Sequence, residues 1–120
     1  MDLRPSSLTP TAALSALARS GRRFLEVFKH GSLVVEVYKP ERVDLQQPHA
    51  RDELYVVIAG RGTFVNGDQR HPFEPGQVLF VPAGVVHRFE EFTSDFSAWV
   101  FFYGPEGGEP SHEPEAPARI

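Results

Sequence analysis

Short apolar runs of strand length, separated by turn residues, fill most of the chain from Arg23 to Gly104. These runs are RFLEVFK, SLVVEVYKP, ELYVVIAG, GTFV, QVLFVP, VVHRFEEF and SAWVFFYG. Runs that are rich in β-branched and aromatic residues and recur roughly every ten residues are typical of all-β sandwiches and small barrels. The sequence therefore predicts an all-β fold, a small antiparallel β-barrel that closes to protect its strand edges.

One segment ahead of these runs has the composition of a short helix. In TPTAALSALARSG, Thr9 or Thr11 is a suitable N-terminal cap, alanine and leucine fill the middle, and Gly21 is a suitable end. We therefore expect an N-terminal lead-in with a short helix over 1–22, a β-barrel over 23–104 and a flexible tail over 105–120. The tail is rich in proline, glycine and glutamate and has little apolar surface to bury.

The pair Asn66-Gly67 is the strongest hairpin signal in the chain. Both central residues of a type I′ turn need a positive φ, and asparagine and glycine adopt it most readily. The pair therefore predicts a tight turn between two antiparallel strands.

Composition excludes several classes of function. A net charge of -4 and the absence of a basic cluster argue against a nucleic-acid partner. The chain has no cysteine, which excludes thiolate chemistry and leaves imidazole, carboxylate or amide as possible metal ligands. No apolar run approaches the roughly 18 residues that span a bilayer, and the N-terminal residues do not resemble a signal peptide. We expect a cytoplasmic protein of one domain with no membrane partner.

Polar residues precede the apolar run ELYVVIAG. Gln47, His49 and Glu53 share one parity, so on an extended chain their side chains point to one face. The same parity continues through Val57, which would carry the three polar groups into an apolar interior. An unpaired carboxylate is costly there, and a divalent cation is one standard compensation. His87, whose neighbours of the same parity are apolar, is a second imidazole that can join the first.

The spacing of these residues resembles the two motifs of the cupin superfamily. The first family motif is glycine, five residues, His-x-His, three or four residues, glutamate, six residues and glycine. The second is glycine, five residues, Pro-x-Gly, two residues, histidine, three residues and asparagine. The matching positions are Gln47, His49, Glu53 and Gly60 in the first motif and Gly76, Pro82, Gly84 and His87 in the second. Together the two motifs are a specific signal.

The resemblance implies a β-barrel of the cupin or jelly-roll type, with metal ligands at positions 47, 49, 53 and 87. His49, Glu53 and His87 keep the chemistry of the family's ligands, whereas Gln47 replaces a histidine. An amide oxygen is a harder and weaker ligand than imidazole and shifts the preference from copper toward iron or manganese. Gln47 is explained equally well as an amide that lines the mouth of the site.

The resemblance also implies a divalent transition metal ion as cofactor, namely iron, manganese, nickel or zinc. The predicted function is a metal-dependent enzyme of the dioxygenase, isomerase or lyase type, acting on a small organic molecule inside the barrel. No general acid–base pair is recognisable outside the ligand set. The alternative is a non-catalytic small-molecule binding or sensory module, which would use the same ligands.

Two of the runs, LYVVIA and AWVFFY, are apolar at both parities. One face of a small barrel ordinarily meets solvent, so such strands need a second layer on the outside. One short helix is too small to provide it. The sequence therefore predicts a homodimer that covers this sheet surface.

Overall fold

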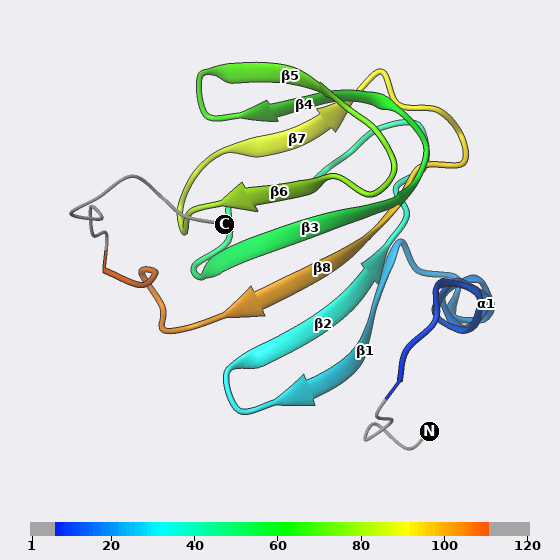
Figure 1. The fold of residues 1–120 in the computed structure, drawn as a ribbon, viewed down its shortest axis with the longest axis horizontal. Helices are drawn as coiled ribbons and strands as arrows, with labels where there is room; N and C mark the ends of the chain where they lie inside the picture. The colour runs from blue at the N-terminus through cyan, green and yellow to red at the C-terminus, as the bar shows by residue number, and fades with distance from the viewer. Residues whose placement is uncertain (1–6, 111–120) are drawn as a thin grey trace.

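The computed structural model describes residues 7–110 and contains one helix and eight strands in that range (Figure 1). The helix α1 spans Pro10–Ser20. The strands are β1 (Phe24–His30), β2 (Leu33–Tyr38), β3 (Asp52–Ala59), β4 (Gly62–Asn66), β5 (Gln69–Phe73), β6 (Val78–Val81), β7 (His87–Glu90) and β8 (Ser97–Tyr103).

The strands form two antiparallel sheets of unequal size. The larger sheet has the order β1-β2-β8-β3-β6, and the smaller has the order β5-β4-β7. The prediction of an all-β fold with a short N-terminal helix is confirmed. The sheets are of the jelly-roll type and do not join into one closed barrel, so the expectation of full closure is corrected.

Capping residues set the ends of α1 where the sequence predicts them. The Thr9 hydroxyl accepts a hydrogen bond from the Ala12 N–H at 3.2 Å, and Gly21 ends the helix with a φ of 72°. The buried face of α1 packs against β1 and β2, on the side of the large sheet that faces away from the small sheet. The helix therefore covers only the β1–β2 end of that outer face (Figure 1).

The main core lies between the two sheets and is rich in aromatic side chains. Its most deeply buried members come from facing positions of both sheets and pack mostly edge to face or at a tilt. They are Tyr55, Val57, Phe64, Phe73, Val81, Phe89, Phe96, Ala98 and Val100. This parity means that alternate residues of β3, including Glu53, also face inward.

The predicted hairpin forms, but its turn lies one residue later than expected. Asn66 pairs with Gln69, so the two central residues of the turn are Gly67 and Asp68. Only Gly67 of this pair has a positive φ, 63°. A glycine at the first central position is the requirement of a type II′ turn, so the predicted type I′ turn is wrong.

The first residues of the predicted tail are held against the start of β3. The Gly107 N–H donates to the Ala50 carbonyl at 2.7 Å, and the Glu109 N–H donates to the Asp52 carboxylate at 2.8 Å. These bonds anchor the segment 105–110, and the remainder of the predicted tail, 111–120, lies outside the described residues. No helix in the part of the chain that the structure describes is long and apolar enough to cross a membrane.

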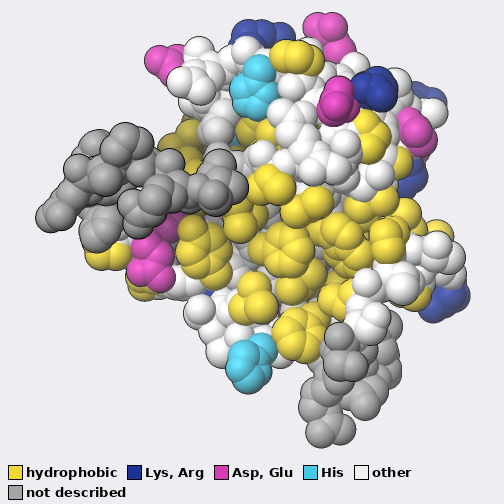
Figure 2. All heavy atoms as spheres, viewed as in Figure 1, with side chains coloured by type: hydrophobic (Ala, Val, Ile, Leu, Met, Phe, Trp, Pro, Cys, Tyr) yellow, Lys and Arg dark blue, Asp and Glu magenta, His cyan; other side chains and the backbone are white. Residues whose placement is uncertain are grey.

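The outer face of the large sheet carries two apolar rows that run from β6 across β3 to β8, where their last members pack against the cluster that contains α1. Cross-strand pairing places Phe80, Leu54 and Phe101 in one row and Val78, Val56 and Trp99 in the other. Figure 2 shows hydrophobic side chains gathered over β6, β3 and β8. Val78 and Phe80 on β6 are 60% and 46% exposed, so this part of the face is open to contact.

Candidate metal centre

The carboxylate of Glu53 is fully buried in the inner face of the large sheet. Its strand, β3, lies between β8 and β6, and the backbone at Glu53 pairs with both neighbours. Within residues 7–110, neither carboxylate oxygen of Glu53 has a hydrogen-bond partner of acceptable geometry. A buried charge without such partners is costly, so this site needs a further positive group.

His87 approaches Glu53 from the opposite sheet, because β7 begins at this residue. Its Nδ1 donates to the Val85 carbonyl at 2.9 Å, which leaves the lone pair on Nε2 in the neutral ring. That Nε2 lies 3.0 Å from Oε1 of Glu53 and 3.1 Å from the Tyr55 hydroxyl. A hydrogen bond from the distal ring nitrogen to a backbone carbonyl is the usual way to orient an imidazole ligand.

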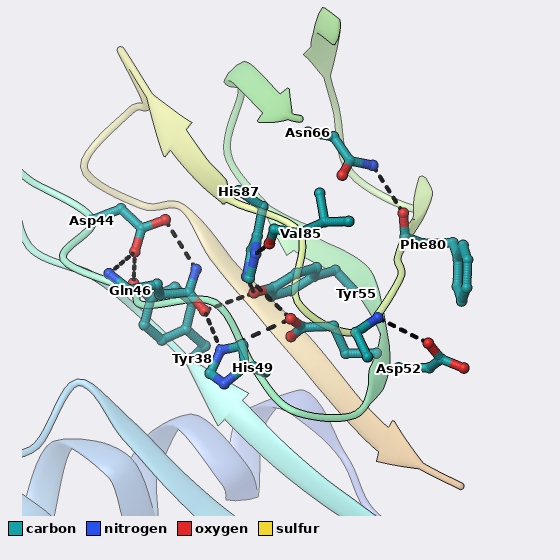
Figure 3. A network of polar contacts seen from close by, with 12 residues as sticks. Tyr38, Asp44, Gln46, His49, Asp52, Tyr55, Asn66, Phe80, Val85 and His87 are labelled. Atoms are coloured by element: carbon teal, nitrogen blue, oxygen red, sulfur yellow. Dashed lines mark hydrogen bonds and ion pairs between the residues drawn. The ribbon is translucent and has the colours of Figure 1, made fainter. Parts of the chain in front are cut away.

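His49 completes the group from the loop that precedes β3. Its Nε2 lies 3.8 Å from Oε1 of Glu53, and its ring centroid is 5.4 Å from that of His87. One potential ligand atom from each of the three residues lies within 4.8 Å of the others. Figure 3 shows His49 and His87 converging beside Tyr55.

The pKa values of the two histidines are shifted in opposite directions. Burial lowers the pKa of His49 below its ordinary value, and the nearby Glu53 carboxylate offsets this only in part. Burial also acts to lower the pKa of His87, but the Glu53 carboxylate and the Val85 carbonyl outweigh it and raise the pKa above its ordinary value. His87 is therefore the group at which a proton competes most strongly with any other cation.

The three residues fit a divalent transition ion. Two imidazole nitrogens and one carboxylate converge, the carboxylate is otherwise unpartnered, and one imidazole is oriented through its distal nitrogen. When the His87 ring is neutral, its Nε2 lone pair faces an oxygen of Glu53, and these two electron-rich atoms repel each other. A cation bound between them would turn this repulsion into two favourable contacts. Two histidines and one carboxylate with open positions are a donor set typical of iron and related ions.

Gln47 is placed differently from the three other candidates. The loop before β3 is irregular, so the strand parity that put Gln47 on the face of His49 does not apply there. The side chain of Gln47 is exposed at the lip of a cavity that His49 also lines. The neighbouring amide, Gln46, points inward instead, and its Oε1 accepts from the Tyr55 hydroxyl at 2.7 Å and lies 3.4 Å from Nε2 of His49.

A buried aspartate that we did not predict holds this loop in place. Asp44 accepts hydrogen bonds from the Tyr38 hydroxyl and from the backbone and side-chain amides of Gln46 (Figure 3). It also accepts one from the Phe89 N–H. The last of these spans 45 residues and ties the loop to β7. Asp44 therefore positions Gln46, and through it the surroundings of His49.

We expect Asp44→Ala to lower the free energy of unfolding by about 3 kcal/mol, because it leaves the Tyr38 hydroxyl and the Phe89 N–H buried without an acceptor. Chemical denaturation of the metal-free protein measures this change. Asp95→Ala, an exposed aspartate in a turn, is the control and should change stability by less than about 0.5 kcal/mol. Equal effects of the two substitutions would contradict the role given to Asp44.

A cavity of about 460 Å³ opens beside His49 on the inner face of β1, β2 and β8. It is lined by Phe24, Glu36, Tyr38, Leu45, Gln46, Gln47, His49, Val100 and Phe102. Two larger cavities, of about 660 and 710 Å³, lie at the turn between β5 and β6 and beside α1, and none of the three candidate ligands lines them. The smaller cavity is therefore the one that a ligand of this centre would occupy.

Glu36 is a partly buried acid in this cavity. Burial, together with the carboxylates of Glu26 and Glu53, raises its pKa to about 7, and Arg22 offsets this only in part. A folded-state pKa above the ordinary value means that ionisation opposes folding. In the metal-free protein this unfavourable contribution begins above the ordinary pKa of 4.5 and is complete above about 7.

We therefore expect the Glu36→Gln variant to be more stable than the wild type at about pH 8. The free energy of unfolding of the variant minus that of the wild type should be about 1–2 kcal/mol larger at about pH 8 than at about pH 4. This figure is reduced for the partial exposure of the side chain. Unfolding of both proteins in denaturant at the two pH values measures the difference. A stability difference that does not change with pH would contradict the raised pKa.

Comparisons with known proteins agree with this architecture. The cupin domain family matches residues 34–104. An uncharacterized protein, SCO3923, of Streptomyces coelicolor is 34% identical over 85 residues, covering 69% of this chain and 81% of that protein. Two solved structures are also similar, a cupin-2 domain containing protein from Shewanella frigidimarina and one from a study of the DMSP lyases RdDddP and RnDddQII.

The Shewanella structure has a TM-score of 0.54 at 19% identity, covers 68% of this chain and 79% of its own, and supports the fold alone. The DMSP lyase structure has a TM-score of 0.60 at 27% identity, covers 69% of this chain and only 47% of its own. The family match spans β2 to β8 and includes all three candidate ligands. This chain belongs to the cupin domain family.

Proposed function

We propose that this chain is a metal-dependent enzyme of the dioxygenase, isomerase or lyase type, with His49, Glu53 and His87 holding one divalent transition ion. The observation that carries the proposal is the fully buried Glu53 carboxylate, which has no hydrogen-bond partner within residues 7–110 and faces two imidazoles. Iron, manganese, nickel and zinc suit this donor set. The similarity to a DMSP lyase structure supports an enzymatic role.

An ion held there would supply Lewis-acid chemistry to an oxygen atom of the substrate. The residues of the chain prepare the site for this. The Val85 carbonyl holds His87 in the tautomer whose Nε2 faces the centre, and the sheet fixes Glu53 from both sides. His49 lies at the boundary between the centre and the cavity, where Phe102 packs edge-on against its ring at 4.9 Å. The Phe102 ring covers this side of His49 and limits the access of bulk water there.

The substrate would be a small organic molecule with an oxygen donor and a modest apolar body, because the cavity is small and largely apolar away from its acid. Metal-loaded protein should be screened against small carboxylic acids, diketones and phenolic compounds, with oxygen uptake and melting temperature followed together. Oxygen consumption would identify a dioxygenase, and turnover without it an isomerase or lyase. A melting shift without turnover would contradict an enzymatic role and identify a binding module.

We also propose that the chain forms a homodimer through the outer face of β6, β3 and β8. The two apolar rows on this face carry no charged side chain, and a second copy presents the same rows in a self-complementary way. Figure 2 shows their extent. Burying this face in a dimer would remove from water the side chains of β6 that α1 does not reach.

Light scattering at micromolar concentration should therefore give about twice the 13.4 kDa mass of one chain. Phe80→Glu places a charge in the middle of one apolar row and should shift the protein to monomer. Val86→Glu is the matched control, since Val86 is 55% exposed but lies in the loop before β7. A wild-type monomer, or a Phe80→Glu dimer as stable as the wild type, would contradict this interface.

A further inference from the structure

The cavity beside the candidate metal centre contains an acid that the centre does not use. Glu36 lies in the middle of β2, opposite Val100 of β8, and both side chains line the cavity. Tyr38, two residues on, has the same parity and lines it as well. Within the described residues no hydrogen bond or ion pair reaches the Glu36 carboxylate. The acid is thus presented to whatever occupies the cavity.

The charges that face Glu36 are mainly negative. Glu26 lies directly opposite on β1, and Glu53 is close enough on β3 to act on it electrostatically. Arg22, two residues before β1, acts in the opposite direction but more weakly than either glutamate, and its guanidinium lies 4.8 Å from the centroid of the Phe24 ring. An ion at the candidate metal centre would compensate Glu53, and Arg22 would then offset only part of the negative charge of Glu26 and Glu36.

Three aromatic side chains share the wall of this cavity with two aliphatic residues, two amides and His49. Phe24 and Tyr38 pair across β1 and β2, and Phe102 closes the other side next to His49. Aromatic side chains beside a carboxylate can bind organic cations such as quaternary ammonium groups, because the ring faces and the acid attract the same charge. Phe24 already attracts one cation, the guanidinium of Arg22. A cavity of about 460 Å³ suits a ligand of only a few carbon atoms beyond the cationic group.

We propose that this cavity binds a small organic cation, whose positive group lies between Glu36 and the aromatic rings and whose oxygen donor points toward His49. This deepens the function proposed above by assigning a charge to the substrate. Placing the oxygen donor on a metal ion rests on that proposed function. The cation subsite itself is formed by Glu36, Phe24, Tyr38 and Phe102 and does not depend on the metal.

The test compares two probes of the same shape and different charge. Choline and 3,3-dimethylbutan-1-ol differ in the replacement of a quaternary nitrogen by carbon. Calorimetric or NMR titration of the metal-free full chain should give at least about fivefold tighter binding of choline. Glu36→Gln should remove this preference and leave the affinity for the neutral alcohol unchanged. Equal binding of the two probes by the wild type would overturn the proposal.

Glu106→Gln is the matched control, because Glu106 is an exposed glutamate outside the cavity, and it should keep the preference for choline. If Glu36→Gln does not fold, the wild type provides a second measurement. Its affinity for choline should fall as the pH drops below about 7, the pKa of Glu36, while its affinity for the alcohol stays constant. The other titratable groups that line the cavity are Tyr38 and His49, and the pKa of His49 lies below its ordinary value. Glu26, Glu53 and Arg22 act on Glu36 from outside this lining. A choline affinity that is flat across this range would overturn the proposal.

The outcome also separates this proposal from the function proposed above. If the protein prefers choline but retains no metal, the result supports the cation subsite and contradicts the proposal of a metal-dependent enzyme. Retention of a metal without preference for choline overturns the cation subsite and leaves the enzyme in place. In metal-loaded protein, glycine betaine should bind more tightly than its neutral-bodied analogue 3,3-dimethylbutanoate, and the reverse order would overturn the orientation given to the ligand.

Discussion

The His87→Ala variant is expected to bind a divalent transition ion at least about 100-fold more weakly than the wild type. Removing a residue that only orients a metal ligand typically costs about 10- to 100-fold in metal affinity, and removing the ligand itself should cost more. His87 is buried, lies 3.0 Å from Glu53 and is oriented by the Val85 carbonyl. Titration of metal-free protein against a chromophoric chelator measures the affinity. His30→Ala, at the exposed end of β1, is the control and should bind as the wild type does.

The same titration tests the two amides of the loop. Gln47→Ala should weaken binding much less than His87→Ala, because its side chain is exposed at the lip of the cavity and an amide is a weaker ligand than imidazole. Gln46→Ala should weaken metal binding indirectly, because Gln46 contacts His49 and the Tyr55 hydroxyl. Its loss of affinity should lie between those of Gln47→Ala and His87→Ala. Equal losses in Gln47→Ala and His87→Ala would contradict this order and make Gln47 a ligand.

Glu53→Gln is expected to change metal binding and stability in opposite directions. The affinity for the ion should fall by at least about 100-fold. The metal-free protein should become more stable by about 1–3 kcal/mol at alkaline pH, where the His87 ring is neutral and does not pair with the carboxylate. The second change follows because the wild-type carboxylate is buried without a hydrogen-bond partner in the described chain, and an amide is less costly to bury than a charge.

Denaturation of the metal-free proteins, followed by the same experiment with the ion present, measures both effects. The ion should stabilise the wild type and have little effect on Glu53→Gln. A metal-free Glu53→Gln protein that is less stable than the wild type would show that the carboxylate is a structural partner of His87. In that case the buried carboxylate would no longer argue for a metal ion.

Much of the fold follows from local sequence signals. The capping threonine and the closing glycine of α1 act within a few residues, and the apolar runs become strands because β-branched and aromatic residues pack well on a sheet. The hairpin at Gly67 was located by its glycine, but its register depends on the pairing of Asn66 with Gln69. That pairing is set by the core between the sheets, which no short stretch of sequence contains.

Only those residues of the candidate centre that stand at fixed positions of the two sequence motifs could be predicted from the sequence. His49, Glu53 and His87 stand at motif positions, and the structure brings them together from a loop and two sheets. The roles of Asp44 and Gln46 were missed because they lie in an irregular loop, where strand parity does not tell which side chain points inward.

Glu36 was missed for a different reason. It alternates with Val35 and Val37 on β2, so the sequence shows that it shares no face with these apolar residues. Which of the two faces is covered by α1 and which lines a cavity is decided by tertiary packing. Glu36 therefore lines a cavity together with aromatic side chains, although its place in the sequence suggests a solvent-facing residue.

The most direct test of the metal centre is the metal content of the protein itself. Metal-free full-length chain should be incubated in turn with iron, manganese, nickel and zinc, freed of loose ions and subjected to elemental analysis, alongside a variant that combines His49→Ala, Glu53→Gln and His87→Ala. The account predicts about one tightly held ion per chain for at least one of these metals, and none for the combined variant. A wild type that retains none of the four ions, or a combined variant that retains as much as the wild type, would contradict it.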